Sequence, residues 1–239
     1  MRGLRFILVF SATVVVGSCA SANATPSTER TPPPAPEVFL VGDSISDGAT
    51  GLAIDATFER QGWNHDRVAI SSQAVVDMRA FITSGAQVRQ PDVMVIELGT
   101  NDMGSVELDD ENSGSPPDAD AQQRAYDAAL DQLDAALHDM RDVPCVVWLD
   151  VADWSDLDFG PSGHYNLQTW APRYNAQLRQ RQAQYPNLHV VSYAEQLRAR
   201  GMPWIDDNYD GWRIHPASDA AKQAVADVMV RGVHGACGI

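Results

Sequence analysis

The 239-residue sequence has few basic residues, few cysteines and no cysteine–histidine spacing typical of a zinc site. It contains 17 lysines and arginines against 32 aspartates and glutamates, and its formal net charge is −15 at pH 7. Without a basic stripe, such a surface repels nucleic acid and anionic lipid headgroups, so we expect neither as a partner. The absence of zinc-type spacing likewise leads us to expect no bound metal.

The most apolar stretch of the chain, residues 7–16, lies close to the N-terminus. Arg2 and Arg5 precede it without any acidic residue, and small residues follow it. A basic start, a short apolar stretch and small residues after it are typical of a signal peptide. The stretch is also too short to span a bilayer comfortably. We therefore predict that residues 1–24 are a signal peptide and that the protein is exported.

Two processing sites fit this signal peptide. Residues 16–19 (VGSC) come immediately after the apolar stretch and resemble a lipobox, in which Cys19 becomes the lipidated first residue. Residues 22–24 (ANA) offer instead an A-x-A site, with cleavage after Ala24. We favour a lipoprotein on the outer face of the cytoplasmic membrane over a freely secreted protein. In either case residues 25–36 (TPSTERTPPPAP) form a proline-rich tether, and residues 37–239 form one folded domain.

Strand and helix patterns alternate along this domain. Short apolar runs, the strongest of them rich in β-branched residues, predict five strands, at residues 38–41, 67–71, 93–98, 143–151 and 188–192. Apolar residues at helical spacing predict helices at residues 121–140, 167–184 and 218–233. The alternation indicates an α/β protein, a three-layer doubly wound fold with a mostly parallel five-stranded sheet. In such sheets the functional site forms at the carboxyl ends of the strands.

Cys145 and Cys237 are left as an even pair if Cys19 is lipidated or removed. Cys145 begins its predicted strand and so lies at the sheet edge opposite the expected site. The last predicted helix runs back toward that same edge and brings Cys237 with it. In an oxidising compartment we therefore predict a disulfide between them.

Three short motifs fall at or near the carboxyl ends of the predicted strands. A serine in the first (GDS, residues 42–44) stands at a strand-to-helix turn, which exposes the Ser44 hydroxyl and directs its amide into the site. In the second (GTND, residues 99–102), the Asn101 amide can stabilise a developing oxyanion. His215, just before the last predicted helix, is the histidine best placed to act as a base.

Each motif also has a simpler interpretation. Ser44 can cap a helix, Asn101 can form an Asx turn, and His215 can be a solvated loop residue. Together, however, the three motifs in this order and spacing resemble the SGNH, or GDSL-like, hydrolase family over residues 38–233. The resemblance implies a serine esterase that needs no cofactor, with Ser44 as nucleophile, His215 as general base, and the Ser44 amide and the Asn101 side chain in the oxyanion hole. The turns expected to build this site contain Gly42, Asp43 and Gly99.

The stretch that corresponds to the family's second block departs from the family pattern. The family has there a glycine whose amide is a further oxyanion donor, whereas residues 69–74 (AISSQA) contain none. Any residue except proline has a backbone N–H, so we expect the amide of Ser72 or Gln73 to replace it. Glycine nevertheless allows unusual dihedral angles that these two residues would resist.

The segment before His215 also departs from the pattern. The family usually has an aspartate three residues before the histidine, and this position is Trp212 here. Asp210, five residues before, is our choice for the acceptor that orients His215. Asp206 and Asp207 are further candidates.

The leading functional hypothesis is an esterase that hydrolyses acyl esters of small molecules, lipids or carbohydrates. A second hypothesis is an O-acyltransferase that uses the same site with a sugar hydroxyl as acceptor. A third is a catalytically weak envelope-binding domain, which the altered second block motivates. We expect the protein to be a monomer, with a small-molecule or glycan ester as substrate and contact with a membrane only through the N-terminal anchor.

Overall fold

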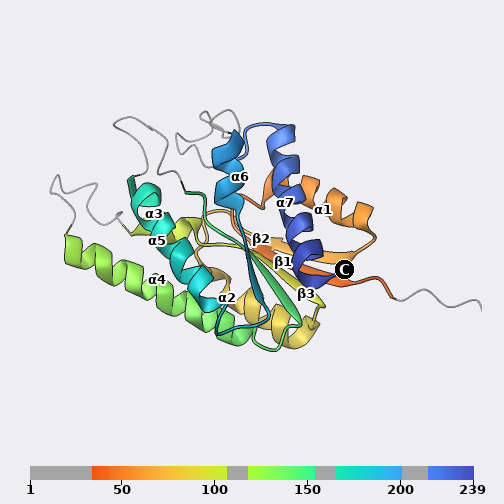
Figure 1. Ribbon diagram of the computed structural model, residues 1–239, viewed down its shortest axis with the longest axis horizontal. Helices are drawn as coiled ribbons and strands as arrows, with labels where there is room; N and C mark the ends of the chain where they lie inside the picture. The colour runs from red at the N-terminus through yellow and green to blue at the C-terminus, as the bar shows by residue number, and fades with distance from the viewer. Residues whose placement is uncertain (1–33, 107–117, 154–164, 201–214) are drawn as a thin grey trace, which may run out of the picture. The chain divides into compact units, whose positions relative to one another are not determined.

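The computed structural model describes residues 34–106, 118–153, 165–200 and 215–239. The chain divides into two units, Met1–Pro34 and Ala35–Ile239, and the elements below belong to the second. Its sheet is entirely parallel and has the strand order β2-β1-β3-β4-β5 (Figure 1). The strands are β1 (Glu37–Gly42), β2 (Asn64–Ala69), β3 (Val93–Glu97), β4 (Cys145–Leu149) and β5 (Leu188–Val191).

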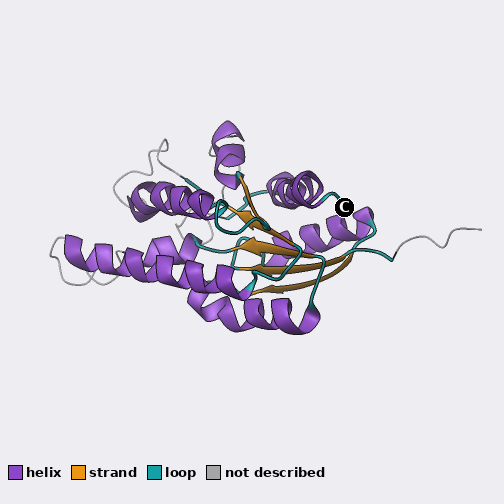
Figure 2. Ribbon diagram, turned by 60° about the horizontal axis from the view of Figure 1, so that its bottom comes forward, coloured by secondary structure: helices purple, strands orange, loops and turns teal. Residues whose placement is uncertain are grey.

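Helices cover both faces of this sheet (Figure 2). On one face, α1 (Gly48–Gln61) packs against α7 (Asp219–Cys237), and on the other α2 (Val75–Ser84) packs against α4 (Ala119–Asp139). The remaining helical elements are η1 (Gly85–Arg89), which extends α2, α3 (Thr100–Ser105), α5 (Tyr165–Arg181) and α6 (Tyr193–Arg200). The three-layer doubly wound fold is therefore confirmed. No helix in the described ranges is long and apolar enough to cross a membrane.

The central strands form where the sequence predicts them because both of their faces are buried. Every residue of β3 and β4 is buried, which explains their unbroken runs of apolar residues. The second strand was predicted at residues 67–71, and this range was wrong: β2 begins at Asn64. Its first three residues are polar, and its position follows from pairing with β1 rather than from an apolar pattern of its own.

Two of the helices that periodicity did not predict have exposed apolar residues, and one of them also has buried polar residues. In α1, Thr50 and Thr57 are buried, whereas the Leu52 side chain is 69% exposed. In α2, Val76 is 52% exposed. By contrast, the apolar residues at helical spacing in α4 are buried at Tyr126, Leu133 and Leu137, and Leu130 is half-buried.

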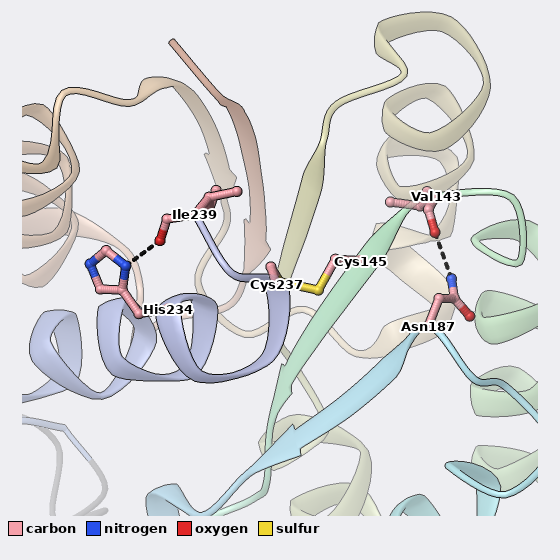
Figure 3. Close-up of a disulfide and its surroundings, with 6 residues drawn as sticks. All are labelled: Val143, Cys145, Asn187, His234, Cys237 and Ile239. Carbon is pink, nitrogen blue, oxygen red and sulfur yellow. Dashed lines mark hydrogen bonds between the residues drawn. A yellow bond between two sulfur atoms is a disulfide. The ribbon is translucent and has the colours of Figure 1, made fainter. Parts of the chain in front are cut away.

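The predicted disulfide between Cys145 and Cys237 is present (Figure 3). Cys145 is the first residue of β4 and Cys237 the last residue of α7, with 5.8 Å between their Cα atoms. Close to it, the Asn187 side chain donates hydrogen bonds to the carbonyl oxygens of Val143, at 2.8 Å, and Met140, at 3.0 Å. The C-terminal end of α7 is thus fixed to the edge of the sheet that lies opposite the carboxyl ends of the strands.

Removing this disulfide is expected to lower the free energy of unfolding by roughly 4 to 5 kcal/mol, because it closes a loop between residues 92 positions apart. Denaturant unfolding of the oxidised protein and of a Cys145→Ala, Cys237→Ala variant measures the difference. Cys19→Ala serves as the control and should leave the stability of the domain unchanged. A loss below about 1 kcal/mol in the double variant would contradict the expectation.

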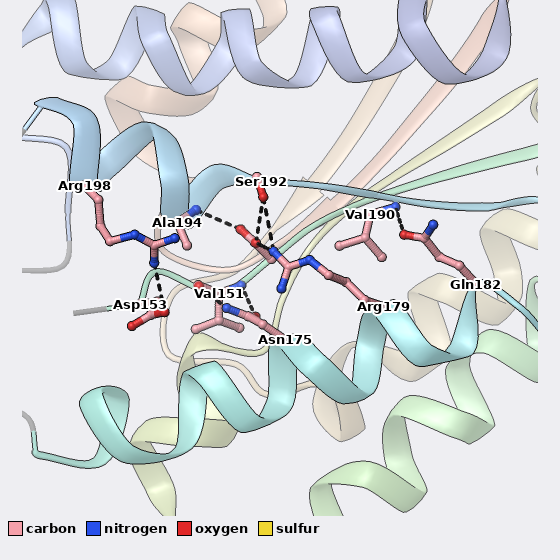
Figure 4. A network of polar contacts seen from close by, with 10 residues as sticks. Val151, Asp153, Asn175, Arg179, Gln182, Val190, Ser192, Ala194 and Arg198 are labelled. Atoms are coloured by element: carbon pink, nitrogen blue, oxygen red, sulfur yellow. Dashed lines mark hydrogen bonds and ion pairs between the residues drawn. The ribbon is translucent and has the colours of Figure 1, made fainter. Parts of the chain in front are cut away.

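Side chains protect both edges of the sheet. At the β2 edge, the exposed Asp66 forms an ion pair with Arg89 of η1. At the β5 edge, the backbone amide of Val190 donates to Oε1 of Gln182 at 2.9 Å (Figure 4). The outward-facing amide of β5 therefore has its hydrogen-bond acceptor within the same chain.

Candidate active site

Ser44 and Asn101 follow β1 and β3, which are neighbours in the sheet. Nδ2 of Asn101 donates to Oδ2 of Asp43 at 3.0 Å, and this bond joins the first motif directly to the second. Oδ1 of Asp43 accepts from the amide of Ile45 at 3.0 Å. The Asp43 carboxylate, which is fully buried, thus fixes the turn around Ser44 and the side chain of Asn101 at the same time.

The turn that carries Ser44 leaves its polar groups available. Asp47 caps α1, its Oδ1 accepting from the amide of Gly48 at 2.6 Å, so the interpretation of Ser44 as a helix cap is wrong. The Ser44 side chain is half-buried. In the ranges that the structure describes, its amide donates no hydrogen bond to another residue. A hydroxyl and an unengaged amide at a strand end are what nucleophilic attack and oxyanion binding require.

The second-block segment lies against both motifs. Ser71 Oγ donates to Oδ2 of Asp47 at 3.0 Å, and the Gln73 carbonyl accepts from Nδ2 of Asn101 at 3.0 Å. Ser72 has φ +63°, the left-handed conformation that favours glycine. Ser72 thus adopts the dihedral angles that a glycine would adopt at lower steric cost. Neither Ser72 nor Gln73 donates its backbone amide to another described residue.

Ser72→Gly is expected to raise the free energy of unfolding by up to about 1 kcal/mol, because glycine adopts a left-handed conformation without the steric cost of a side chain. Gln73→Gly is the matched control, since Gln73 does not have a positive φ. This variant should lose roughly 0.5 to 1 kcal/mol through greater freedom of the unfolded chain. Thermal unfolding of both variants tests the pair. An equal loss of stability in the two variants would contradict the left-handed conformation of Ser72.

The two hydrogens of the Asn101 amide already have two acceptors, Asp43 Oδ2 and the Gln73 carbonyl. For Asn101 to bind an oxyanion, the oxyanion must replace one of them. Of the two acceptors, the Gln73 carbonyl is the neutral one, so it is the weaker competitor.

Asp102, the residue after Asn101, is buried and accepts from the amide of Val75 at 3.0 Å. Burial raises the pKa of Asp102 to about 6.

His215 precedes α7, which Ser218 caps by accepting from the Ala221 amide at 3.2 Å. Pro216, its neighbour, lines a small cavity with Tyr193 and Leu197 of α6, the helix that follows β5. Burial, and then the nearby charges of Glu97 and Asp43, raise the pKa of the Tyr193 phenol. These neighbours place His215 at the same edge of the sheet as Ser44.

Asp210, like Asp206, Asp207 and Trp212, lies outside the described residues.

A second polar network fixes the ends of β4 and β5 (Figure 4). The buried Asp150 forms an ion pair with Arg179 and accepts from the amide of Ala194 at 2.8 Å, and burial raises its pKa. Asn175 bonds both the amide and the carbonyl of Val151 at 2.8 Å. In the part of the chain that the structure describes, no group of three or more His, Cys, Asp and Glu side chains could hold a metal ion.

Sequence reasoning missed Glu97, the last residue of β3. Its side chain is almost fully buried and its Oε2 accepts from Ser46 Oγ at 2.8 Å, directly beneath the turn that carries Ser44. The available signal was a single acidic residue at the end of an otherwise apolar run (VMVIE). An acid in a central buried strand needs a partner, and that requirement points to the site.

A sequence profile of the GDSL-like lipase/acylhydrolase family matches residues 40–223, a range that contains all three motifs. The chain belongs to this family. It is accordingly an enzyme that acts on ester bonds, an acyl ester hydrolase or acyltransferase. No curated protein matches the sequence.

Solved structures share its fold at low sequence identity. An acetylxylan esterase from Geobacillus stearothermophilus is 16% identical, with a TM-score of 0.60 over 83% of this chain and 94% of that one. A lipase/acylhydrolase from Enterococcus faecalis is 17% identical, with a TM-score of 0.58 over 84% and 96%. The catalytic domain of Streptococcus pneumoniae peptidoglycan O-acetyltransferase A is 14% identical, with a TM-score of 0.56 over 84% and 94%.

Proposed function

We propose that the protein is a serine carboxylesterase with Ser44 as its nucleophile. The observation that carries the proposal is the hydrogen bond between Asn101 and Asp43, which joins the two motifs beside a serine whose amide is unengaged. A turn held in this way presents a hydroxyl and an oxyanion donor to the same carbonyl group.

In the proposed reaction, Ser44 Oγ attacks the carbonyl carbon of the ester while His215 takes the hydroxyl proton. The tetrahedral intermediate collapses, the bond to the alcohol breaks, and His215 returns the proton to the leaving oxygen. Water then attacks the acyl-enzyme by the same route and releases the acid. Asp210 is proposed to accept a hydrogen bond from Nδ1–H of His215 and so to fix its tautomer.

The oxyanion of the intermediate is proposed to bind the amide of Ser44 and the amide of Ser72 or Gln73. The Asn101 side chain would join them by exchanging the Gln73 carbonyl for the oxyanion. This exchange favours the transition state over the ground state, because only the charged oxygen competes well for the amide hydrogen.

We propose an acyl ester of a small molecule or glycan as the substrate. The acetylxylan esterase and the peptidoglycan O-acetyltransferase that share this fold support a short acyl group on a polysaccharide as the first class to test. The O-acetyltransferase also motivates the second candidate, transfer of the acyl group to a sugar hydroxyl from the same acyl-enzyme.

Two experiments with the purified protein test the proposal. Reaction with a fluorophosphonate probe should label Ser44, and chromogenic short-chain esters should release free acid. Transfer of the acyl group to added glycan oligomers, in place of acid release, would favour the acyltransferase. If Ser44 is not labelled, the catalytic proposal fails and an envelope-binding role replaces it.

We further propose that the protein is exported and anchored through Cys19. The disulfide between Cys145 and Cys237 supports an oxidising compartment. The mass of the mature protein decides between the two processing sites. A chain that begins at a lipidated Cys19 is heavier, by residues 19–24 and by the acyl chains, than a chain that begins at an unmodified residue 25.

A further inference from the structure

Glu97 lies behind the nucleophile turn with little space around it. Besides the hydroxyl of Ser46, its Oε2 accepts from the amide of Asp43 at 3.3 Å. Gly42 allows this approach, because a Cβ at that position would lie 2.7 Å from Ser46 Cβ and 3.3 Å from Glu97 Oε2. The glycine of the first motif therefore makes room for the Glu97 side chain under the turn.

Glu97 and Asp43 therefore lie in direct contact, through the Asp43 amide. They are 3% and 0% exposed, so two adjacent negative charges there would be without solvent. Two carboxyl groups in such a position share one proton. Burial raises the pKa of both, that of Asp43 to about 7 and that of Glu97 well above its ordinary value, the latter raised further by the charge of Asp43.

The surroundings decide which acid holds the proton. Asp43 accepts hydrogen bonds from the amide of Ile45 and the side chain of Asn101, and both stabilise its ionised form. Glu97 Oε2 accepts from Ser46 and from the Asp43 amide, so the other oxygen is the one left to carry the shared proton. These contacts favour a neutral Glu97 that donates to an ionised Asp43.

The other ionisable groups close to this pair do not change which of the two acids holds the proton. Asp102 and Tyr193 are buried, and the charge of Asp102 raises the pKa of Asp43, but by less than the hydrogen bond from the Ile45 amide lowers it. The cation Arg67 donates to the Ser46 carbonyl at 3.1 Å but is paired with Asp55 at 2.8 Å.

We propose that Glu97 is a positioning residue of the esterase, a neutral acid that holds the Asp43 carboxylate where it fixes both the Ser44 turn and the Asn101 amide. Glu97 does not touch the substrate and transfers no proton in the reaction. It acts through Asp43, whose two oxygens connect the nucleophile to the oxyanion donor. The inference rests on the proposed serine esterase function.

Glu97→Gln and Glu97→Met separate this role from simple packing. In Glu97→Gln the amide oxygen accepts from Ser46 and the NH₂ group donates to Asp43, as the neutral acid does. We expect kcat within a few-fold of wild type at neutral pH. Glu97→Met has a similar length but no donor, and we expect kcat to fall about a hundredfold, as for the loss of one oxyanion donor, with KM changed less than about twofold.

The pH profile gives a readout that packing alone would not move. At alkaline pH the wild-type pair loses its last proton, Glu97 no longer donates, and kcat should decline. Glutamine cannot ionise, so Glu97→Gln should keep its kcat over that range. In infrared spectra at neutral pH, the C=O stretch of a protonated carboxyl group should be present in wild type and absent from Glu97→Gln, which tests the position of the proton without any turnover.

Met94→Ala is the matched control for loss of stability. Met94 is fully buried in the same strand, and it packs toward Gly85 rather than the Ser44 turn. This variant should unfold at a lower temperature with unchanged kcat. A Glu97→Met variant that retains wild-type kcat, or a Glu97→Gln variant with the wild-type alkaline decline, would overturn the inference and leave the esterase proposal intact. Absence of Ser44-dependent hydrolysis in wild type would instead overturn the esterase proposal, and the infrared band would still decide the protonation of Glu97.

Discussion

Ser44→Ala is expected to abolish ester hydrolysis, with a loss of kcat on the order of a million-fold, because no other group replaces an attacking hydroxyl. The fold should be unaffected, since Asp47 and not Ser44 caps α1 and the Ser44 side chain has no partner among the described residues. Steady-state hydrolysis of a chromogenic ester, together with circular dichroism and thermal unfolding, measures both effects.

The control for this variant is Ser84→Ala, an exposed serine at the end of α2. It should retain the wild-type rate and the fluorophosphonate labelling that Ser44→Ala loses. A wild-type rate in Ser44→Ala would show that the nucleophile is elsewhere, and the proposed function would then fail.

Asp210→Asn is expected to reduce kcat roughly ten-thousandfold, the effect of losing the acceptor that holds a catalytic histidine in its working tautomer. An asparagine keeps the size of the side chain but cannot stabilise the imidazolium that forms when His215 takes the proton. Trp212, three residues before the histidine, has no acceptor atom for that bond. We propose Asp210 because the glycine that follows it would allow the carboxylate to reach the imidazole.

Asp206→Asn and Asp207→Asn are the matched controls, since each removes one negative charge from the same stretch. Only the residue that orients His215 should show the large loss, and the other two should stay within a few-fold of wild type. Full activity of Asp210→Asn would assign the acceptor to another group. A large loss of kcat in Asp206→Asn or Asp207→Asn would identify that aspartate as the acceptor.

Burial on both faces made the central strands predictable. The runs in β3 and β4 are continuous because both sides of the sheet are covered, and such runs are visible in the sequence alone. The position of β2 was not predictable, because its first residues are polar and pair with β1 without an apolar pattern of their own. Helix α1 escaped prediction for a related reason, since threonines lie inside and Leu52 outside.

The candidate site, too, was predictable from the sequence only in part. Ser44 and Asn101 were predictable because their motifs stand at the ends of strands that the fold makes neighbours. The contact between Asp43 and Glu97 was not predictable, since the two residues are 54 positions apart and only the parallel pairing of β1 with β3 brings them together. The conformation of Ser72 likewise follows from the contacts of its loop with Asp47 and Asn101, and not from its own preference.

The protected edges of the sheet bear on how the protein tolerates crowding. An open strand edge is a template on which the strand of another chain can add, and repeated addition leads to fibrils. Here a charged pair blocks one edge, and Gln182 occupies the backbone amide of Val190 at the other. A domain concentrated on a surface by an anchor would meet copies of itself constantly, and with both edges occupied those encounters should end in separation rather than in cross-β assembly.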